Sequence, residues 1–231
     1  LLEIKFGVNN MNKEQILHNF YTTERLGANM NDGGGPFGFD IHMALEVCYL
    51  IQEYGCDSII ETGTNMGDTT EFLAKCFPKT NVLSCENNLD FYEKAKKRLD
   101  KFNNVTLYNL SSDDFIKNIS VGFPFYFLDA HWNNYWPLAD EILNIHRGLI
   151  CIHDFDINYL GYSYDEYNNI KNDICFLKKH IGANVDCYIN DPTTMYPFPL
   201  HQKKRLAGRV YYVLGKDNKP LEQCYNFKKH E

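Results

Sequence analysis

Acidic and imidazole side chains follow two apolar runs in the second half of the chain. Asp129 and His131 come after one run, and His153 and Asp154 come at the end of the other. An isolated buried charge is costly, so carboxylates at the ends of buried strands must meet partners or face a ligand. Two carboxylates with an imidazole beside them suit Mg²⁺ or another divalent ion. Such an ion would lower the pKa of a hydroxyl group of a bound substrate. Without a metal, either histidine could act as a general base near pH 7.

A second candidate site is the loop within "IIETGTNMGDTT", residues 59–70, which places Glu61, Gly63 and Gly67 between a strand and a helix. Glycines in such a turn let the backbone approach a ligand closely. The loop lacks the lysine of a phosphate-binding P-loop and the third glycine of a dinucleotide fingerprint, and its acids would repel a pyrophosphate. A cationic ligand fits better, and S-adenosylmethionine carries a sulfonium, an ammonium and a ribose diol. Glu86 could accept hydrogen bonds from both ribose hydroxyls.

Both candidate sites need a parallel sheet to bring their residues to one edge. Continuous apolar runs predict strands buried on both faces, at 57–63, 80–86, 104–110, 123–130 and 148–154. Helical patterns alternate with these runs, which predicts a doubly wound, mainly parallel sheet of the Rossmann-like α/β class. A final strand pair is expected in "ANVDCYIND" and "GRVYYVLG". Because the carboxyl ends of adjacent parallel strands share one edge, ligands are predicted to bind there.

Composition is typical of a single α/β domain. The chain has 231 residues, of which 44% are hydrophobic, enough for a substantial core. The net charge of -7 argues against a non-specific nucleic-acid binder. No apolar run reaches the ~20 residues of a membrane helix, and the eight cysteines include no C-x-x-C pair. We therefore expect a cytoplasmic protein with reduced cysteines and with no nucleic-acid or membrane partner.

Five segments resemble, in order and spacing, the motifs of class I S-adenosylmethionine-dependent methyltransferases: "IIETGTNMGDTT", "VLSCEN", "VTLYNLSSDDF", "FYFLDAHW" and "LICIHDFD". The chain is most similar to small-molecule O-methyltransferases that use a divalent metal. These include the catechol and caffeoyl-CoA types and the macrolide-sugar and cephalosporin-hydroxylase-like groups. The resemblance covers roughly residues 40–155 and the terminal strands. It implies a seven-stranded sheet with an antiparallel strand near the edge, and methyl transfer to a hydroxyl of a small molecule, such as a sugar or secondary metabolite.

The resemblance also implies roles for individual residues in cofactor binding. It assigns the methionine end of the cofactor to the first loop, the ribose to Glu86, and the adenine to the loop after the third strand. The residues concerned are Glu61, Gly63, Thr64, Asn65, Gly67, Glu86, Ser112 and Asp113. Ser112 and Asp113 could also cap a helix, and the two roles are compatible.

For the metal, the resemblance implies Asp129 together with His153 and Asp154. Catechol-type enzymes place an Asp–Asn pair after the fifth strand, and the cephalosporin-hydroxylase-like group places a Glu–Asp pair there. In this chain the residue after the His–Asp pair is Phe155, so the ligand set departs from both patterns, and Asp156 is a candidate substitute. The candidate catalytic residues are Asp129, His131 and His153.

The remaining segments are expected to serve the acceptor. Residues 1–39 are an N-terminal segment whose "GGGPFGF" stretch is either a lid, closing Phe37 or Phe39 over the ligands, or a linker. Residues 40–231 are expected to form the methyltransferase domain. The basic cluster "HQKKRLAGR" (201–209) either receives an anionic group of the acceptor or is a solvated loop.

Three functions stay open on this scaffold. The first is an O-methyltransferase, the second a hydroxylase or other oxidoreductase, and the third a non-catalytic cofactor-binding subunit. The cluster of Asp129, His153 and Asp154 counts against the third. Trp132 and Trp136 either wall the acceptor site or pack beneath a loop. The identity of the acceptor and a homo-oligomeric state are left open.

Overall fold

The computed structural model describes residues 12–26, 34–131, 135–194 and 206–230. The strands of its main sheet are β1 (Ser58–Thr62), β2 (Asn81–Cys85), β3 (Val105–Tyr108), β4 (Phe125–Leu128), β5 (Gly148–His153), β9 (Tyr188–Asn190), β11 (Arg209–Leu214) and β12 (Phe227–Lys229). Two short pairs lie outside this sheet, β6 (Tyr162–Ser163) with β10 (Leu206–Ala207) and β7 (Glu166–Tyr167) with β8 (Ile170–Lys171).

The helices are α1 (Lys13–Thr22), the 3₁₀ helix η1 (Pro36–Phe39), α2 (Ile41–Tyr54), α3 (Asp68–Cys76), α4 (Leu89–Leu99), α5 (Ser112–Asn118), α6 (Leu138–Leu143), α7 (Ile174–Ile181) and α8 (Lys219–Gln223). The helical patterns between the predicted strands correspond to α3, α4 and α6. None of the described helices has both the length and the apolar character that crossing a bilayer requires.

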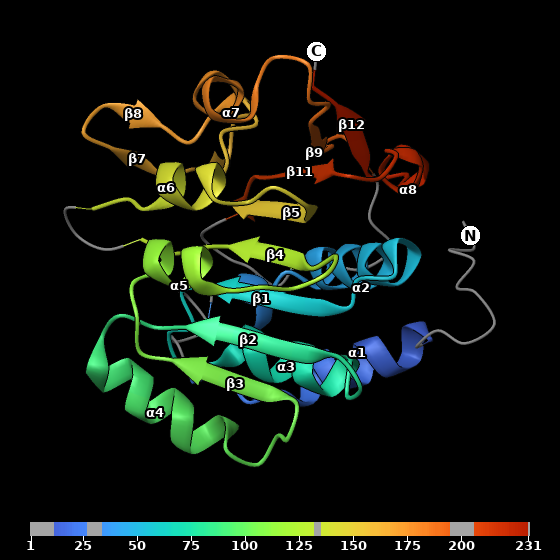
Figure 1. Ribbon diagram of the computed structural model, residues 1–231. Coiled ribbons are helices and arrows are strands. Elements are labelled where there is room, and N and C mark those ends of the chain that lie inside the picture. Colours follow the sequence, from blue (N-terminus) through green and yellow to red (C-terminus); the bar gives the residue numbers. More distant parts are fainter. Residues whose placement is uncertain (1–11, 27–33, 132–134, 195–205, 231) are drawn as a thin grey trace.

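The main sheet has the strand order β12-β9-β11-β5-β4-β1-β2-β3 (Figure 1). Strands β1 to β5 are parallel, whereas β11 runs antiparallel to both β5 and β9. The mainly parallel α/β fold, its five apolar strands and the antiparallel "GRVYYVLG" strand are therefore confirmed.

The predicted count of seven strands is wrong, because β12 pairs with β9 and makes an eighth. This strand is three residues long, and both of its lysines are exposed. An edge strand of that kind lacks the apolar run by which the buried strands were recognised.

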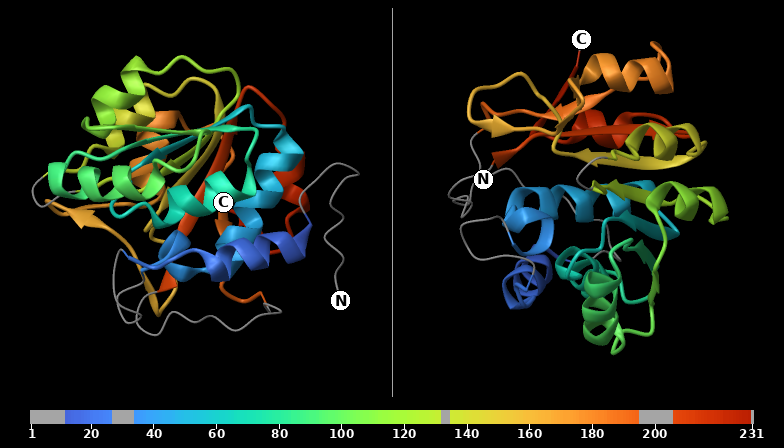
Figure 2. Two further views of the ribbon diagram at one scale, coloured as in Figure 1. Left: turned by 90° about the horizontal axis from the view of Figure 1, so that it is seen from below. Right: turned by 90° about the vertical axis from the view of Figure 1, so that its left-hand side faces the viewer.

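Helices cover both faces of the sheet, as the view from below shows (Figure 2). Side chains of α1, α2 and α3 form one buried cluster with alternate strand residues such as Ile59 and Cys151. Side chains of α5, α6 and α7 form the second cluster with the intervening residues, such as Ile60 and Ile152. Because successive strand residues point to opposite faces, continuous apolar strands are what two covered faces require.

Of the two phenylalanines in the N-terminal glycine-rich stretch, Phe37 is buried in the core and Phe39 packs against it partly buried. The Phe37 ring packs edge-to-face against Phe72 and Phe127, with centroids 5.8 and 5.1 Å away. The Phe39 ring stacks on Phe20 at 4.9 Å. Both rings thus pack on the face covered by α1, α2 and α3, and neither lines the cavity described below. The first glycine of the stretch lies outside the described residues.

A buried ion cluster fixes β11 to α2. The Arg209 guanidinium donates to both Glu46 oxygens at 2.6 and 2.5 Å and to Asp40 Oδ2 at 3.1 Å. Asp40 also caps α2 by accepting from the backbone N–H groups of His42 and Met43. Burial raises the pKa of Glu46 to about 7, although Arg209 opposes that rise. Arg209 is therefore not part of a solvated basic loop, and residues 201–205 of that cluster lie outside the described residues.

Replacing Arg209 by Met should lower the free energy of unfolding by about 3–5 kcal/mol, because two carboxylates would stay buried without their cation. Urea denaturation of the purified variant measures this. The control is Lys229→Ala, which removes an exposed ion pair with Asp186 (2.8 Å) and should cost at most about 1 kcal/mol. Equal losses in the two variants would contradict the role given to the buried cluster.

Candidate functional site

The loop between β1 and α3 lies against the loop that follows β4. The backbone N–H groups of Gly63 and Thr64 both donate to the carbonyl of Cys85, which ties the loop to the end of β2. Gly63 has φ +83°, and a Cβ there would lie 2.8 Å from the carbonyl oxygen of Asp129. Gly67, with φ +79°, precedes α3 and lies against the Leu99 side chain. Both glycines are therefore required by backbone conformation and by close approach.

Glu61 supports this loop from beneath. Its side chain is only 1% exposed and accepts hydrogen bonds from the hydroxyls of Thr70 and Ser84, the latter at 2.7 Å. The Thr64 and Ser84 hydroxyl oxygens are 2.5 Å apart, which extends the network into the loop. Burial raises the pKa of Glu61 to about 7. The carboxyl group thus holds the loop in place, whereas the sequence had suggested that it faces the ligand.

A cavity of about 740 Å³ opens at the carboxyl edge of the sheet. It is lined by Gly63, Asn65, Cys85, Glu86, Asn87, Asn88, Phe91, Leu110, Ser112, Asp129, Ala130, His131 and Tyr167. The predicted cofactor residues that line it are Gly63, Asn65, Glu86 and Ser112. Those that do not are Glu61, Thr64, Gly67 and Asp113.

Glu86 joins two loops while facing this cavity. Its Oε2 accepts from the backbone N–H of Asn65 at 2.7 Å, and its Oε1 accepts from the backbone N–H of Asn88 at 2.8 Å. Each carboxylate oxygen can accept a further hydrogen bond. Glu86 therefore has the position and the remaining capacity to accept from a ligand diol.

One wall of the cavity is apolar, and the sequence did not reveal it. Phe91 and Leu110 line this wall, and their side chains are 37% and 40% exposed. Phe91 stands four residues before Ala95, a spacing that is typical of the core-facing side of a helix. Its exposure shows that the first turn of α4 overhangs the cavity, where it can contact a flat, apolar ligand group.

Ser112 and Asp113 differ in their surroundings although they are adjacent. Ser112 is buried and is the first residue of α5, whose N-terminal cap is Ser111 without a side-chain hydrogen bond. Asp113 is turned to Lys117, with its Oδ2 3.3 Å from the Nζ atom. The structure therefore brings only Ser112 to the cavity.

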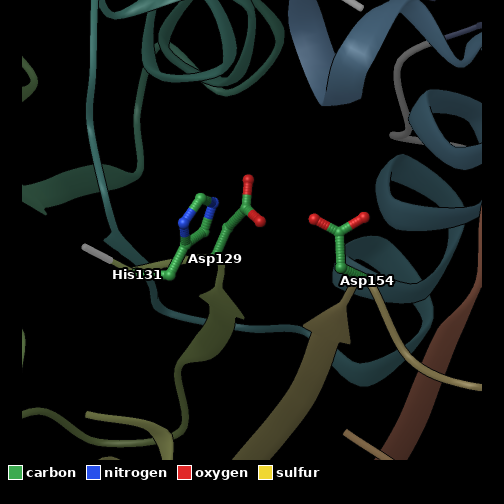
Figure 3. A group of neighbouring side chains, drawn as sticks. All are labelled: Asp129, His131 and Asp154. Carbon is green, nitrogen blue, oxygen red and sulfur yellow. The ribbon is translucent and has the colours of Figure 1, made fainter. Parts of the chain in front are cut away.

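Three side chains converge where β4 and β5 end (Figure 3). Asp129, His131 and Asp154 each offer one ligand atom, and these atoms all lie within 4.8 Å of one another. His153 lies beside the carboxylates, with its Nδ1 3.1 Å from Asp129 Oδ1 and 3.6 Å from Asp154 Oδ2. The group that could hold a metal ion thus contains His131 where the sequence had implied His153.

The turn after β5 orients Asp154 through its backbone. Asp154 has a φ of +51°, and the Asn172 side chain donates to its carbonyl at 2.9 Å. Phe155 follows as a fully buried core residue. Asp156, the candidate substitute ligand, points away, with its carboxylate 3.7 Å from Lys171 Nζ. Only Asp154 of this turn therefore belongs to the cluster.

Trp136 supports the β7–β8 hairpin from behind. Its ring stacks on Tyr167 and on Phe176, with centroid distances of 5.6 and 4.6 Å. Tyr167 lines the cavity and lies 6.2 Å from the His131 ring. Trp136 itself does not line this cavity, and Trp132 lies outside the described residues. On the side of the hairpin the cavity is therefore lined by Tyr167, a residue that the sequence had not singled out.

No protein-family model matches this sequence, and no curated protein does. Its fold, however, is similar to solved structures. A Klebsiella pneumoniae protein assigned as an O-methyltransferase matches with 14% identity and a TM-score of 0.54, over 90% of this chain and 93% of that chain. The cofactor-bound structure of Rv0187 from MTB matches with 16% identity and a TM-score of 0.56, over 87% and 88%. The fold is the Rossmann-like fold of methyltransferases.

Replacing Gly63 by Ala should destabilise this methyltransferase-like fold by roughly 2–4 kcal/mol, because a left-handed backbone is strained and the new Cβ meets the backbone of Asp129. The matched control is Gly55→Ala at the end of α2. There φ is +59° and nothing lies within 4 Å of the new atom, so only the strain of about 1–2 kcal/mol applies. Thermal unfolding of both variants separates the contact from the strain. If Gly63→Ala costs no more than Gly55→Ala, the two loops are not in the contact described.

Proposed function

We propose that this chain transfers a methyl group from S-adenosylmethionine to a hydroxyl of a small molecule, assisted by a divalent metal. The observation that carries the proposal is that one cavity is lined both by the glycine loop with Glu86 and by Asp129 and His131. A methyl donor and its acceptor must meet in one space, and this cavity joins the two sets of residues.

The residues of the cavity fit the chemistry of the cofactor. The described lining residues include the acids Glu86 and Asp129 but no lysine or arginine, which favours a cationic ligand over a phosphorylated one. The free acceptor capacity of Glu86 suits a ribose diol, and Phe91 and Leu110 offer an apolar surface for adenine. At Gly63 the bare backbone leaves room for a ligand to lie against the loop.

The donor set also fits a divalent ion. Two carboxylates and one imidazole, Asp129, Asp154 and His131, would hold Mg²⁺ or Mn²⁺, since both accept oxygen ligands and the imidazole extends the choice to transition ions. A divalent ion at this position would supply Lewis acidity that lowers the pKa of a bound hydroxyl.

The protein's own side chains have separate tasks in this proposal. His153 donates from Nδ1 to Asp129 and lies beside Asp154, and so holds the two carboxylates in one orientation. In a metal-free version of this mechanism His131, which is exposed at the cavity, would instead accept the proton that the acceptor loses on methylation. Tyr167 forms the wall on the same side, where it restricts the shape of the acceptor.

Removal of the Glu86 carboxylate should weaken cofactor binding by at least about tenfold, because hydrogen bonds to a charged acceptor contribute roughly 1.5–3 kcal/mol each. Calorimetric titration of Glu86→Ala with S-adenosylhomocysteine measures the loss. Asp113→Ala is the control, since Asp113 is turned to Lys117 outside the cavity and its loss should leave the affinity within about twofold. Unchanged affinity in Glu86→Ala would remove Glu86 from the site.

Removal of the metal should abolish methyl transfer while leaving cofactor binding largely intact. Treatment with EDTA tests this, and Asp129→Asn and Asp154→Asn should each have the same effect, because each removes a charged ligand. The control is Asp156→Asn, which changes a carboxylate directed at Lys171 and should retain activity.

The readout is release of S-adenosylhomocysteine across a panel of hydroxylated acceptors. Activity that survives EDTA but falls in His131→Ala would indicate a metal-free mechanism in which His131 is the general base. If none of these changes affects turnover, the cluster is structural.

A further inference from the structure

Glu141 is a fully buried acid that the proposed chemistry does not use. It stands on α6, its exposure is 0%, and its helix contributes Leu138 and Ile142 to the apolar cluster on that face of the sheet. Burial raises the pKa of Glu141 to about 7. A core position of this kind is more cheaply filled by leucine, so the carboxyl group needs a reason.

The neighbours of Glu141 belong to the edge of the site. The hydroxyls of Ser112 and Thr62 lie close enough to lower its pKa, against the larger effect of burial. Ser112 lines the cavity at the start of α5, and Thr62 is the last residue of β1. Among the described residues, neither oxygen of Glu141 nor the Ser112 hydroxyl oxygen has a hydrogen bond of regular geometry. These are buried polar atoms for which the surrounding apolar core offers no other partner.

Thr62 connects Glu141 to the metal-ligand candidate. Its hydroxyl oxygen accepts a hydrogen bond from the backbone N–H of Asp129 at 3.3 Å. Since the oxygen is used as an acceptor, the hydroxyl proton is free to be donated, and an acceptor at Glu141 can receive it. A small space of about 10 Å³, room for about one water molecule, is lined by both Asp129 and Glu141. The two acids thus line the same small space.

We propose that Glu141 is a positioning residue, which orients the Asp129 loop through the Thr62 hydroxyl and the start of α5 through the Ser112 hydroxyl. This inference rests on the proposed function, because Asp129 is a metal ligand only there. An outer partner of this type typically accounts for a 10- to 100-fold difference in metal affinity, because a ligand free to move must be ordered when the metal binds. The strand that carries Thr62 is buried along its whole length, so the connection is rigid.

The test is direct titration of the full-length protein with Mn²⁺, followed by electron paramagnetic resonance, beside thermal unfolding of the metal-free protein. Glu141→Leu should bind Mn²⁺ about tenfold more weakly while its melting temperature is unchanged or higher. A residue needed only for packing would lower the melting temperature instead. Thr62→Val removes the hydroxyl group through which Glu141 would act, and it should weaken Mn²⁺ binding to a similar extent. Thr62→Ser keeps the hydroxyl group and should bind Mn²⁺ with the affinity of the wild type.

Two further measurements decide the inference. The double variant Glu141→Leu/Thr62→Val should bind Mn²⁺ no more weakly than either single variant, since both remove one connection. Tyr212→Phe, which deletes another buried hydroxyl from the same apolar cluster, should leave Mn²⁺ affinity unchanged.

Wild-type affinity in Glu141→Leu and Thr62→Val would overturn the inference, as would an equal loss in Tyr212→Phe. If the wild-type protein binds no Mn²⁺, the metal dependence in the proposed function is wrong. That failure is distinguishable from failure of the Glu141 inference, because it is seen before any variant is made.

Discussion

The backbone contact between Gly63 and Asp129 is the constraint on which the carboxyl edge of this sheet depends. β1 and β4 are paired so that Thr62 stands opposite Leu128, and the next residues of the two chains leave the sheet side by side. A Cβ on Gly63 would lie 2.8 Å from the Asp129 carbonyl oxygen, so no side chain fits between the loops. The glycine loop and the acidic loop are consequently packed as one unit. One cavity can therefore be lined by both Glu86 and Asp129.

Buried acids in several parts of the fold differ in how their charge is compensated. Glu46 is paired with Arg209, whereas Glu61 accepts from two hydroxyl groups and forms no ion pair within the described part of the chain. Burial raises the pKa of both, and of Glu141, to about 7. A carboxyl group with a raised pKa stabilises the fold fully below about pH 4.5, and this contribution is lost as the pH rises through about 7. At neutral pH much of this contribution is therefore absent, and at Glu61 its loss concerns the loop between β1 and α3.

The sequence predicted the elements better than the directions of the side chains. Strands buried on both faces have a continuous apolar signature, which located β1 to β5. The edge strand β12 has none, because most of its surface is exposed. At Glu61 the alternation along β1 could have corrected the assignment, since Ile59 and Glu61 share the face covered by α3. No local pattern could have shown that Arg209 is buried, because its partners Asp40 and Glu46 are more than 160 residues away in the chain.

The same alternation accounts for the membership of the acidic cluster. Adjacent residues of an extended chain point to opposite sides, so His153 and Asp154 cannot both face one ion from a regular strand. His153 continues the strand and packs near Phe127, while a left-handed turn at Asp154 brings its carboxylate back toward Asp129. Asp129 and His131 follow β4 two residues apart, and each offers a ligand atom to the same cluster. The membership of the acidic cluster is therefore determined by chain geometry after each strand, and His153 lies beside the two carboxylates.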